Sequence, residues 1–286
     1  MQKSAETLLE KFLSDFFLRL SDDESACDAS DSHRKNGGSG RSGLSAGLDD
    51  CKSDLRPAEG GFPETLKDGS ENPFRIGSAS ESALFEMLRV FVNQILFFNP
   101  AYKLVSVKTE EELIERHIAD SLAPAALIFR YAPSKEIKFA DLGSGAGLPG
   151  IPLSSFASVV PALQGVRCTL VERMGRRAGF LRNSIVQMKL TDRVQVVEKD
   201  LSDVRETFDI ITFRAFRRLK DVAEGLKKIT RRGSEVYVYK RTGEDIRTEI
   251  DELNAEMPGV FKTSVLPYKT FTGDEAFLLN LTGLQD

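Results

Sequence analysis

KFADLGSGAGLPG, residues 138–150, joins a short apolar run to an acidic residue and then to four glycines within eight positions. The apolar residues that follow, beginning with Ile151-Pro152-Leu153, indicate a helix. The stretch therefore predicts a strand, a tight turn and a helix N-terminus. Glycine suits such a turn because it adopts backbone angles that a Cβ forbids and lets a ligand approach the main chain. We interpret the turn as the seat of a nucleotide-like cofactor.

Two glycine motifs overlap within this turn. The pattern G-x-G-x-x-G occurs at Gly145, Gly147 and Gly150, but alone it is a weak indication of a dinucleotide. The pattern D-x-G-x-G-x-G, which begins at Asp141, is better placed because its first glycine, Gly143, follows the strand directly. In S-adenosylmethionine (SAM) methyltransferases this arrangement brings the acidic side chain and the turn backbone near the amino-acid end of the ligand. We therefore predict that Asp141, Gly143 and Gly145 bind SAM.

The chain has 286 residues, of which 41% are hydrophobic, enough for one large domain or two modest ones. No apolar run reaches the roughly 18 residues that a membrane span needs. Charged residues interrupt the apolar pattern near the N-terminus, where a signal-peptide core is missing. The three cysteines are far apart and lack the spacing of metal ligands. We expect a cytoplasmic monomer with reduced thiols, no metal and no membrane contact.

Composition divides the chain into three parts. Residues 1–20 carry a helical stripe of leucine and phenylalanine, and the same periodicity resumes at 84–96. Residues 21–80 are rich in Ser, Gly and Asp, and such a segment buries too little apolar surface to offset the entropy of ordering. We predict an N-terminal helical cap, residues 1–20 and 81–132, interrupted by a disordered low-complexity insertion. Residues 133–286 form the predicted SAM-binding domain.

Strands and helices alternate after the glycine turn, as in a doubly wound α/β unit. The fold class that we predict is α/β, a Rossmann-like methyltransferase fold with a central, mostly parallel sheet and a C-terminal antiparallel hairpin. Such a sheet leaves a ligand crevice at the carboxyl ends of its strands. The later strands are predicted at 166–171, 194–197, 208–212, 235–239, 261–266 and 276–281.

An acidic side chain ends each of the first three predicted strands. Glu172 follows the second, where a carboxylate accepts hydrogen bonds from a ribose diol, and Asp200 follows the third, within reach of an adenine amino group. An acid after the second strand also fits NAD, but Glu172 lies 29 positions after Gly143, whereas the usual separation is about 20. Together with Asp141, these acids favour SAM. Helix-capping or surface roles for Glu172 and Asp200 are the alternative.

Basic side chains gather in three runs that the net charge of −4 conceals. Residues 21–80 carry 12 acidic and 7 basic side chains, so the rest of the chain has a net charge of about +1. A single run indicates a solvated helix face, but three in one domain favour the phosphates of RNA or DNA. The runs are Arg173, Arg176, Arg177 and Arg182; Arg214, Arg217, Arg218 and Lys220; and Lys227, Lys228, Arg231 and Arg232.

A predicted helix begins near Thr109, which suits the N-cap, and has three glutamates in its first turn, where they complement the helix dipole. His117 and Asp120 lie three positions apart and share one face of this helix. A metal site would need further ligands that the sequence does not offer. We interpret His117 as a packed, hydrogen-bonding or RNA-facing residue.

These motifs resemble those of one family. The run from Asp141 to Leu153 resembles the signature of the RsmG (GidB) family, the small-subunit rRNA guanine-N7 methyltransferases, because few methyltransferases have Leu-Pro-Gly-Ile-Pro after the glycines. Residues 117–122, HIADSL, are similar to the family's His-x-x-Asp-Ser-Leu. Residues 176–181 and 208–216 are similar as well. The resemblance extends from about residue 84 to the end of the chain.

What the resemblance implies is a SAM site at Gly143, Leu148, the pair Lys199 and Asp200, and Arg214. It also implies a reaction that needs no general base, because guanine N7 has an in-plane lone pair and no proton. We therefore predict no catalytic acid or base. The protein has to orient N7 and the methyl group, and orientation alone can supply roughly 7–11 kcal/mol.

The predicted function is SAM-dependent methylation of N7 of a specific guanine in 16S rRNA, as naked RNA or within the small ribosomal subunit. Arg217, Arg218 and His117 are the predicted RNA-binding residues. Two other classes remain open, a noncatalytic SAM- or RNA-binding module and an NAD-dependent oxidoreductase. Binding of SAM without binding of NAD would separate the oxidoreductase from the other two.

Overall fold

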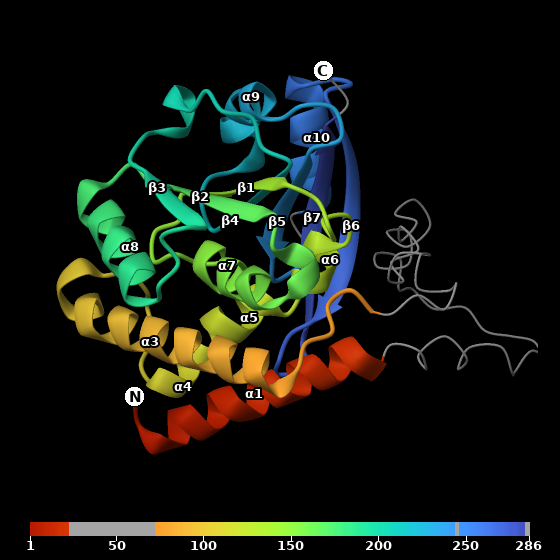
Figure 1. Ribbon diagram of the computed structural model, residues 1–286. Helices are drawn as coiled ribbons and strands as arrows, with labels where there is room; N and C mark the ends of the chain where they lie inside the picture. The colour runs from red at the N-terminus through yellow and green to blue at the C-terminus, as the bar shows by residue number, and fades with distance from the viewer. Residues whose placement is uncertain (23–71, 244–245, 284–286) are drawn as a thin grey trace, which may run out of the picture.

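The computed structural model describes residues 1–22, 72–243 and 246–283. A seven-stranded sheet in the order β3-β2-β1-β4-β5-β7-β6 forms its centre (Figure 1). Strands β1 to β5 run parallel, and β7 is antiparallel to both of its neighbours, which confirms the predicted sheet and its C-terminal hairpin. The strands are β1 (Ile137–Leu142), β2 (Val166–Val171), β3 (Val194–Val197), β4 (Ile210–Arg214), β5 (Glu235–Lys240), β6 (Phe261–Lys269) and β7 (Glu275–Gly283).

Helices cover both faces of the sheet, so its central strands are buried on two sides and are almost continuously apolar. On one face lie α7 (Gly150–Val159) and α8 (Gly175–Gln187), whose apolar side chains pack with Phe139 of β1. On the other face lie α9 (Leu219–Ile229) and α10 (Ile246–Glu256), which pack with the next residue of β1, Ala140 (Figure 1). Neighbouring residues of one strand therefore belong to two cores.

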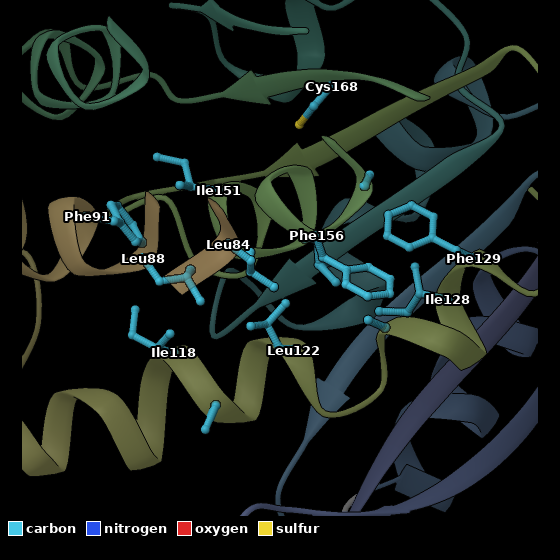
Figure 2. Close-up of a cluster of buried hydrophobic side chains, with 14 of the residues drawn as sticks. Leu84, Leu88, Phe91, Ile118, Leu122, Ile128, Phe129, Ile151, Phe156 and Cys168 are labelled. Atoms are coloured by element: carbon cyan, nitrogen blue, oxygen red, sulfur yellow. The ribbon is translucent and has the colours of Figure 1, made fainter. Parts of the chain in front are cut away.

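The N-terminal helices α1 (Lys3–Asp22) and α3 (Ser78–Tyr102) extend the first of these cores. Their apolar stripes are buried, and Figure 2 shows Leu88 and Phe91 of α3 in one cluster with Ile151 and Phe156 of α7. The predicted helical cap therefore shares its core with the sheet domain.

The segment between α3 and β1 contains four short helical pieces. These are α4 (Glu110–Leu113), the π-helix η2 (Ile114–Ala119), α5 (Asp120–Leu122) and α6 (Ala125–Phe129). The predicted N-cap is confirmed, because Glu112 N donates to Thr109 Oγ1 at 3.1 Å. The wide turns of a π-helix are uncommon and occur often at functional sites.

Most of the predicted insertion, residues 23–71, lies outside the described residues. The end of the predicted segment is ordered, however, since Phe74 is fully buried against Phe156 and α3 begins at Ser78. The boundary predicted at residue 80 is therefore too late. Within the described ranges, no helix is both long enough and apolar enough to cross a membrane.

Candidate functional site

The glycine turn lies in the middle of the sheet, because β1 is paired with both β2 and β4. Gly143, Gly145 and Gly147 have φ angles of +63°, +55° and +84°, which other residues adopt only with strain. A Cβ on Gly143 would lie 2.1 Å from the ring of Phe216. The first glycine therefore provides the predicted turn angle, and the ring of Phe216 lies in the space that a Cβ would fill.

The buried side chain of Asp141 holds this turn in place. Its carboxylate accepts hydrogen bonds from Ser144 Oγ at 2.6 Å, Gly150 N at 3.2 Å and Thr212 Oγ1 at 3.1 Å. Burial raises its pKa to about 7, although the hydrogen bonds act in the opposite direction. The side chain has no exposed surface. Asp141 therefore fixes the turn in place, and its predicted contact with the cofactor stays a prediction.

A cavity of about 180 Å³ lies beside the turn, where β1, β2 and β3 end; we call it the first cavity. Four of the predicted cofactor-binding residues line it: Gly143, Glu172, Lys199 and Asp200. Its other walls are Val171, Arg173, Met174, Arg177, Leu201, Ala215, Phe216 and Arg217.

Glu172 connects the turn to the start of α8. One carboxylate oxygen accepts a hydrogen bond from Gly145 N at 2.9 Å, and the other accepts one from Met174 N at 2.8 Å. The side chain is buried, but its oxygens keep further lone pairs for hydroxyl donors. Glu172 therefore shapes the wall of the first cavity and offers it an acceptor.

Asp200 also lines the first cavity, and its carboxylate already accepts hydrogen bonds from other groups of the protein. It accepts hydrogen bonds from Ser202 N at 3.2 Å and from Arg217 Nη2 at 2.9 Å. The hydrogen bond from Ser202 N, and then Arg217, lower its pKa. Arg217, predicted to bind RNA, thus lies in the wall of the predicted cofactor cavity, whereas Arg218 is exposed beside Asp221.

Three further predicted cofactor residues do not line the first cavity: Gly145, which donates its N–H to Glu172 in the cavity wall, Leu148 and Arg214. Leu148 is half-buried in the glycine turn and packs against the larger core. Arg214, at the end of β4, faces the other way and lines a second cavity with Asp120, Tyr239, Lys240, Arg241, Tyr268 and Ala276. The chain thus passes from the second cavity to the first between Arg214 and Ala215.

The second cavity is small, about 20 Å³, and strongly charged. The Asp120 carboxylate lies 3.7 Å from Arg214 Nη2 and 3.6 Å from Arg241 Nη1. Burial raises the pKa of Asp120, and the two guanidinium groups act against this. His117, near the same arginines, has a pKa of about 4 because of burial and the charge of Arg214, so it is neutral at pH 7.

Sequence reasoning missed two features of the site. Phe216 lies over Gly143, and its place after a strand that ends at the crevice was the available signal. The convergence of Asp120 with Arg214 and Arg241 gave no local signal, since the partners are far apart in the chain. Among the described residues, no three acidic, histidine or cysteine side chains gather as they would around a metal ion.

Comparison with known proteins adds an independent finding. The family model of the rRNA small subunit methyltransferase G (GidB) matches residues 84–273. The chain is 29% identical over 227 residues to the ribosomal RNA small subunit methyltransferase G of Treponema denticola, covering 71% of this chain and 85% of that protein. It is 33% identical over 164 residues to the protein of that name from Haemophilus influenzae (strain PittEE), covering 57% and 74%. A solved O-methyltransferase from Bacillus cereus in complex with SAH has a TM-score of 0.45 and 17% identity, covering 70% of this chain and 90% of that chain.

Proposed function

The chain belongs to the rRNA small subunit methyltransferase G family, and from this we propose that it transfers a methyl group from SAM to N7 of a specific guanine in 16S rRNA. The match over residues 84–273 is the observation that carries the proposal, because it includes the glycine turn and every residue of the first cavity. It favours this function over an NAD-dependent oxidoreductase and over a noncatalytic binding module.

The first cavity suits the cofactor. Gly143 has no side chain to obstruct a ligand at the turn, and Glu172 and Asp200 supply acceptors for the ribose hydroxyls and the adenine amino group. Bound SAM would supply an electrophilic methyl group. The protein's own task there is to hold the ligand against the turn, with Asp141 and Glu172 fixing the backbone.

The reaction needs orientation more than proton transfer. Guanine N7 carries a lone pair in the ring plane and no proton, so no side chain has to remove one. We assign no catalytic acid or base. The residues around the first cavity align N7 with the methyl group and exclude water, and an aligned geometry can account for about 7–11 kcal/mol of the barrier.

The RNA is held by basic side chains at the mouth of the site. Arg217 and Arg218 follow β4 directly, and Arg173 and Arg177 line the first cavity from the β2 side. Such side chains neutralise phosphates and position the RNA without reading its sequence. The substrate is a ribosomal RNA, so we place the reaction in the cytoplasm.

The proposal is tested by incubating the purified protein with labelled SAM and small ribosomal subunits or rRNA from a strain without this gene. We expect 7-methylguanosine, at one position, in nucleoside digests analysed by mass spectrometry. A transcript with 7-deazaguanosine at that position is the control, because it lacks the nucleophile. The proposal would be overturned by methylation of that transcript, by methylation of a base other than guanine, or by the absence of any methylation.

A further inference from the structure

The second cavity shares no lining residue with the first, yet it is built from buried charges at the end of β4, where the chain continues into the wall of the first cavity. Asp120 is only 5% exposed, and neither guanidinium lies close enough to its carboxylate for a hydrogen bond. Arg214 Nη1 is buried and has no hydrogen-bond partner among the described residues. Burying a donor such as Arg214 Nη1 without a partner is costly, and the Asp120 carboxylate beside it can accept hydrogen bonds, so the pair points to a ligand with both an acceptor and donors.

Neighbouring contacts hold these two groups in place. Arg214 Nη2 donates to the main-chain oxygen of Arg116 in the π-helix at 2.7 Å, and Tyr239 Oη donates to Ser121 O at 2.8 Å. Both bonds connect β4 or β5 to the segment that carries Asp120. The carboxylate and the free guanidinium nitrogen are therefore pre-positioned before any ligand arrives.

We propose that the second cavity reads the Watson–Crick edge of the target guanine, with Asp120 accepting hydrogen bonds from N1–H and the exocyclic N2 amino group. This inference rests on the proposed function, since the base must present N7 to SAM. The Hoogsteen edge that carries N7 is then turned toward the first cavity, and only the opposite edge of the purine is free for recognition.

The size of the cavity supports reading of an edge. A space of about 20 Å³ fits one water-sized group, such as an exocyclic amino group, and is too small for a purine. An ionised carboxylate accepts two parallel hydrogen bonds, matching N1–H and N2–H, and a guanidinium donates to O6. Arg241, with a side chain 52% exposed, lies at the rim, where it can move to admit the base.

The alternative is that Asp120 only stabilises the fold by neutralising Arg214 and Arg241. The two roles differ in one observable property, the response to removal of the N2 amino group from the substrate. A stabilising residue is indifferent to that change, whereas a reading residue is not. Inosine makes the change, because it lacks the amino group and keeps N7, O6 and N1–H.

The test measures kcat/KM for two RNA fragments that carry guanosine or inosine at the methylated position. For the unaltered protein we expect inosine to lower kcat/KM about 10- to 100-fold, as loss of a hydrogen bond to a buried charge does. For Asp120→Asn we expect a similar loss on guanosine, and a difference between the two RNAs of less than about 3-fold. Asp251→Asn, at an exposed aspartate of α10, is the matched control and should discriminate like the unaltered protein.

Each outcome decides the matter. Equal rates on both RNAs with the unaltered protein would overturn the inference, and this comparison stands even where Asp120→Asn does not fold. Discrimination that survives in a folded Asp120→Asn protein, checked by its SAM affinity and thermal melting, would remove Asp120 from the reading role. Failure to methylate guanosine at all would overturn the proposed function itself, and the inference with it.

Discussion

The first cavity takes its walls from the turns after β1, β2, β3 and β4, whereas the second brings Asp120 against side chains from the four strands β4 to β7 and from Arg241. The first depends on shape, because glycine leaves space and the carboxylates of Asp141 and Glu172 fix the backbone of the turn. The second depends on charge, because a buried carboxylate faces two guanidinium groups. A change of size should therefore damage the first cavity most, and a change of charge the second.

The strongest way to break this comparison is Gly143→Val. The new side chain would collide with Phe216 and would have to adopt a φ of +63°. We expect SAM affinity to fall at least about 100-fold, which corresponds to roughly 2.7 kcal/mol, as measured by calorimetry. Gly179→Val is the control, because Gly179 lies in α8 with open space at its Cβ position and should leave SAM affinity unchanged. Normal SAM binding by Gly143→Val would show that the ligand lies elsewhere.

Arg214→Ala tests the charge of the second cavity. The Arg214 side chain is 17% exposed, and removing it leaves Asp120 with one remaining cationic partner, so we expect the free energy of unfolding to fall by about 2–4 kcal/mol. Arg218→Ala, whose side chain is 65% exposed, should change it by less than about 0.5 kcal/mol. Denaturant titration compares the two, and equal losses would contradict the distinction.

The same Arg214→Ala protein also tests the role that the family resemblance implies for this residue. If Arg214 holds the carboxylate of SAM, SAM affinity measured without RNA will fall. A normal dissociation constant would assign Arg214 to the second cavity alone, where the structure places it.

The pH dependence of stability should differ in sign between the two regions. The pKa of Asp141 is raised from 3.8 to about 7, so its contribution to stability is complete below pH 4 and is lost as the pH rises to 7. The pKa of His117 is lowered from 6.5 to about 4, so its contribution is complete above pH 6.5 and is lost as the pH falls to 4. Each should amount to about 1–3 kcal/mol across this window.

The measurement is the unfolding free energy of the unaltered protein minus that of a variant, taken from pH 4 to 7. For Asp141→Asn this difference should decrease with rising pH, and for His117→Gln it should increase. Hydrogen bonds lost in either variant shift the whole curve without changing its slope. Two curves with the same sign of slope would contradict the assignment.

The two regions also differ in how far the sequence predicts them. The strands 166–171 and 194–197 were predicted with their observed bounds. The turn between β1 and α7 follows from glycines that are close in the sequence, so its prediction does not depend on the order of the strands in the sheet. The second cavity could not be predicted, because Arg214 reaches Arg116 and Asp120 across more than ninety residues and only the sheet order brings them together. The pair of Arg217 and Asp200 was not predicted either: the two residues are 17 positions apart, but they follow different strands, β4 and β3, and only the fold brings them together.

The smallest effect concerns Arg217, which lines the first cavity. Its ion pair with Asp200 is partly exposed on both sides, at 37% and 31%, so it contributes at most about 1 kcal/mol. A ligand amino group that binds Asp200 competes with this guanidinium for the carboxylate, and Arg217→Ala should therefore tighten SAM binding up to about 5-fold in the absence of RNA. RNA binding should weaken at the same time, with the salt dependence reduced by about one counterion, because a phosphate partner is lost. Arg218→Ala should show the RNA effect alone, since Arg218 does not line the first cavity. If Arg217→Ala weakens the binding of SAM instead, the guanidinium contacts the cofactor directly. If SAM affinity is unchanged, Asp200 does not bind the adenine.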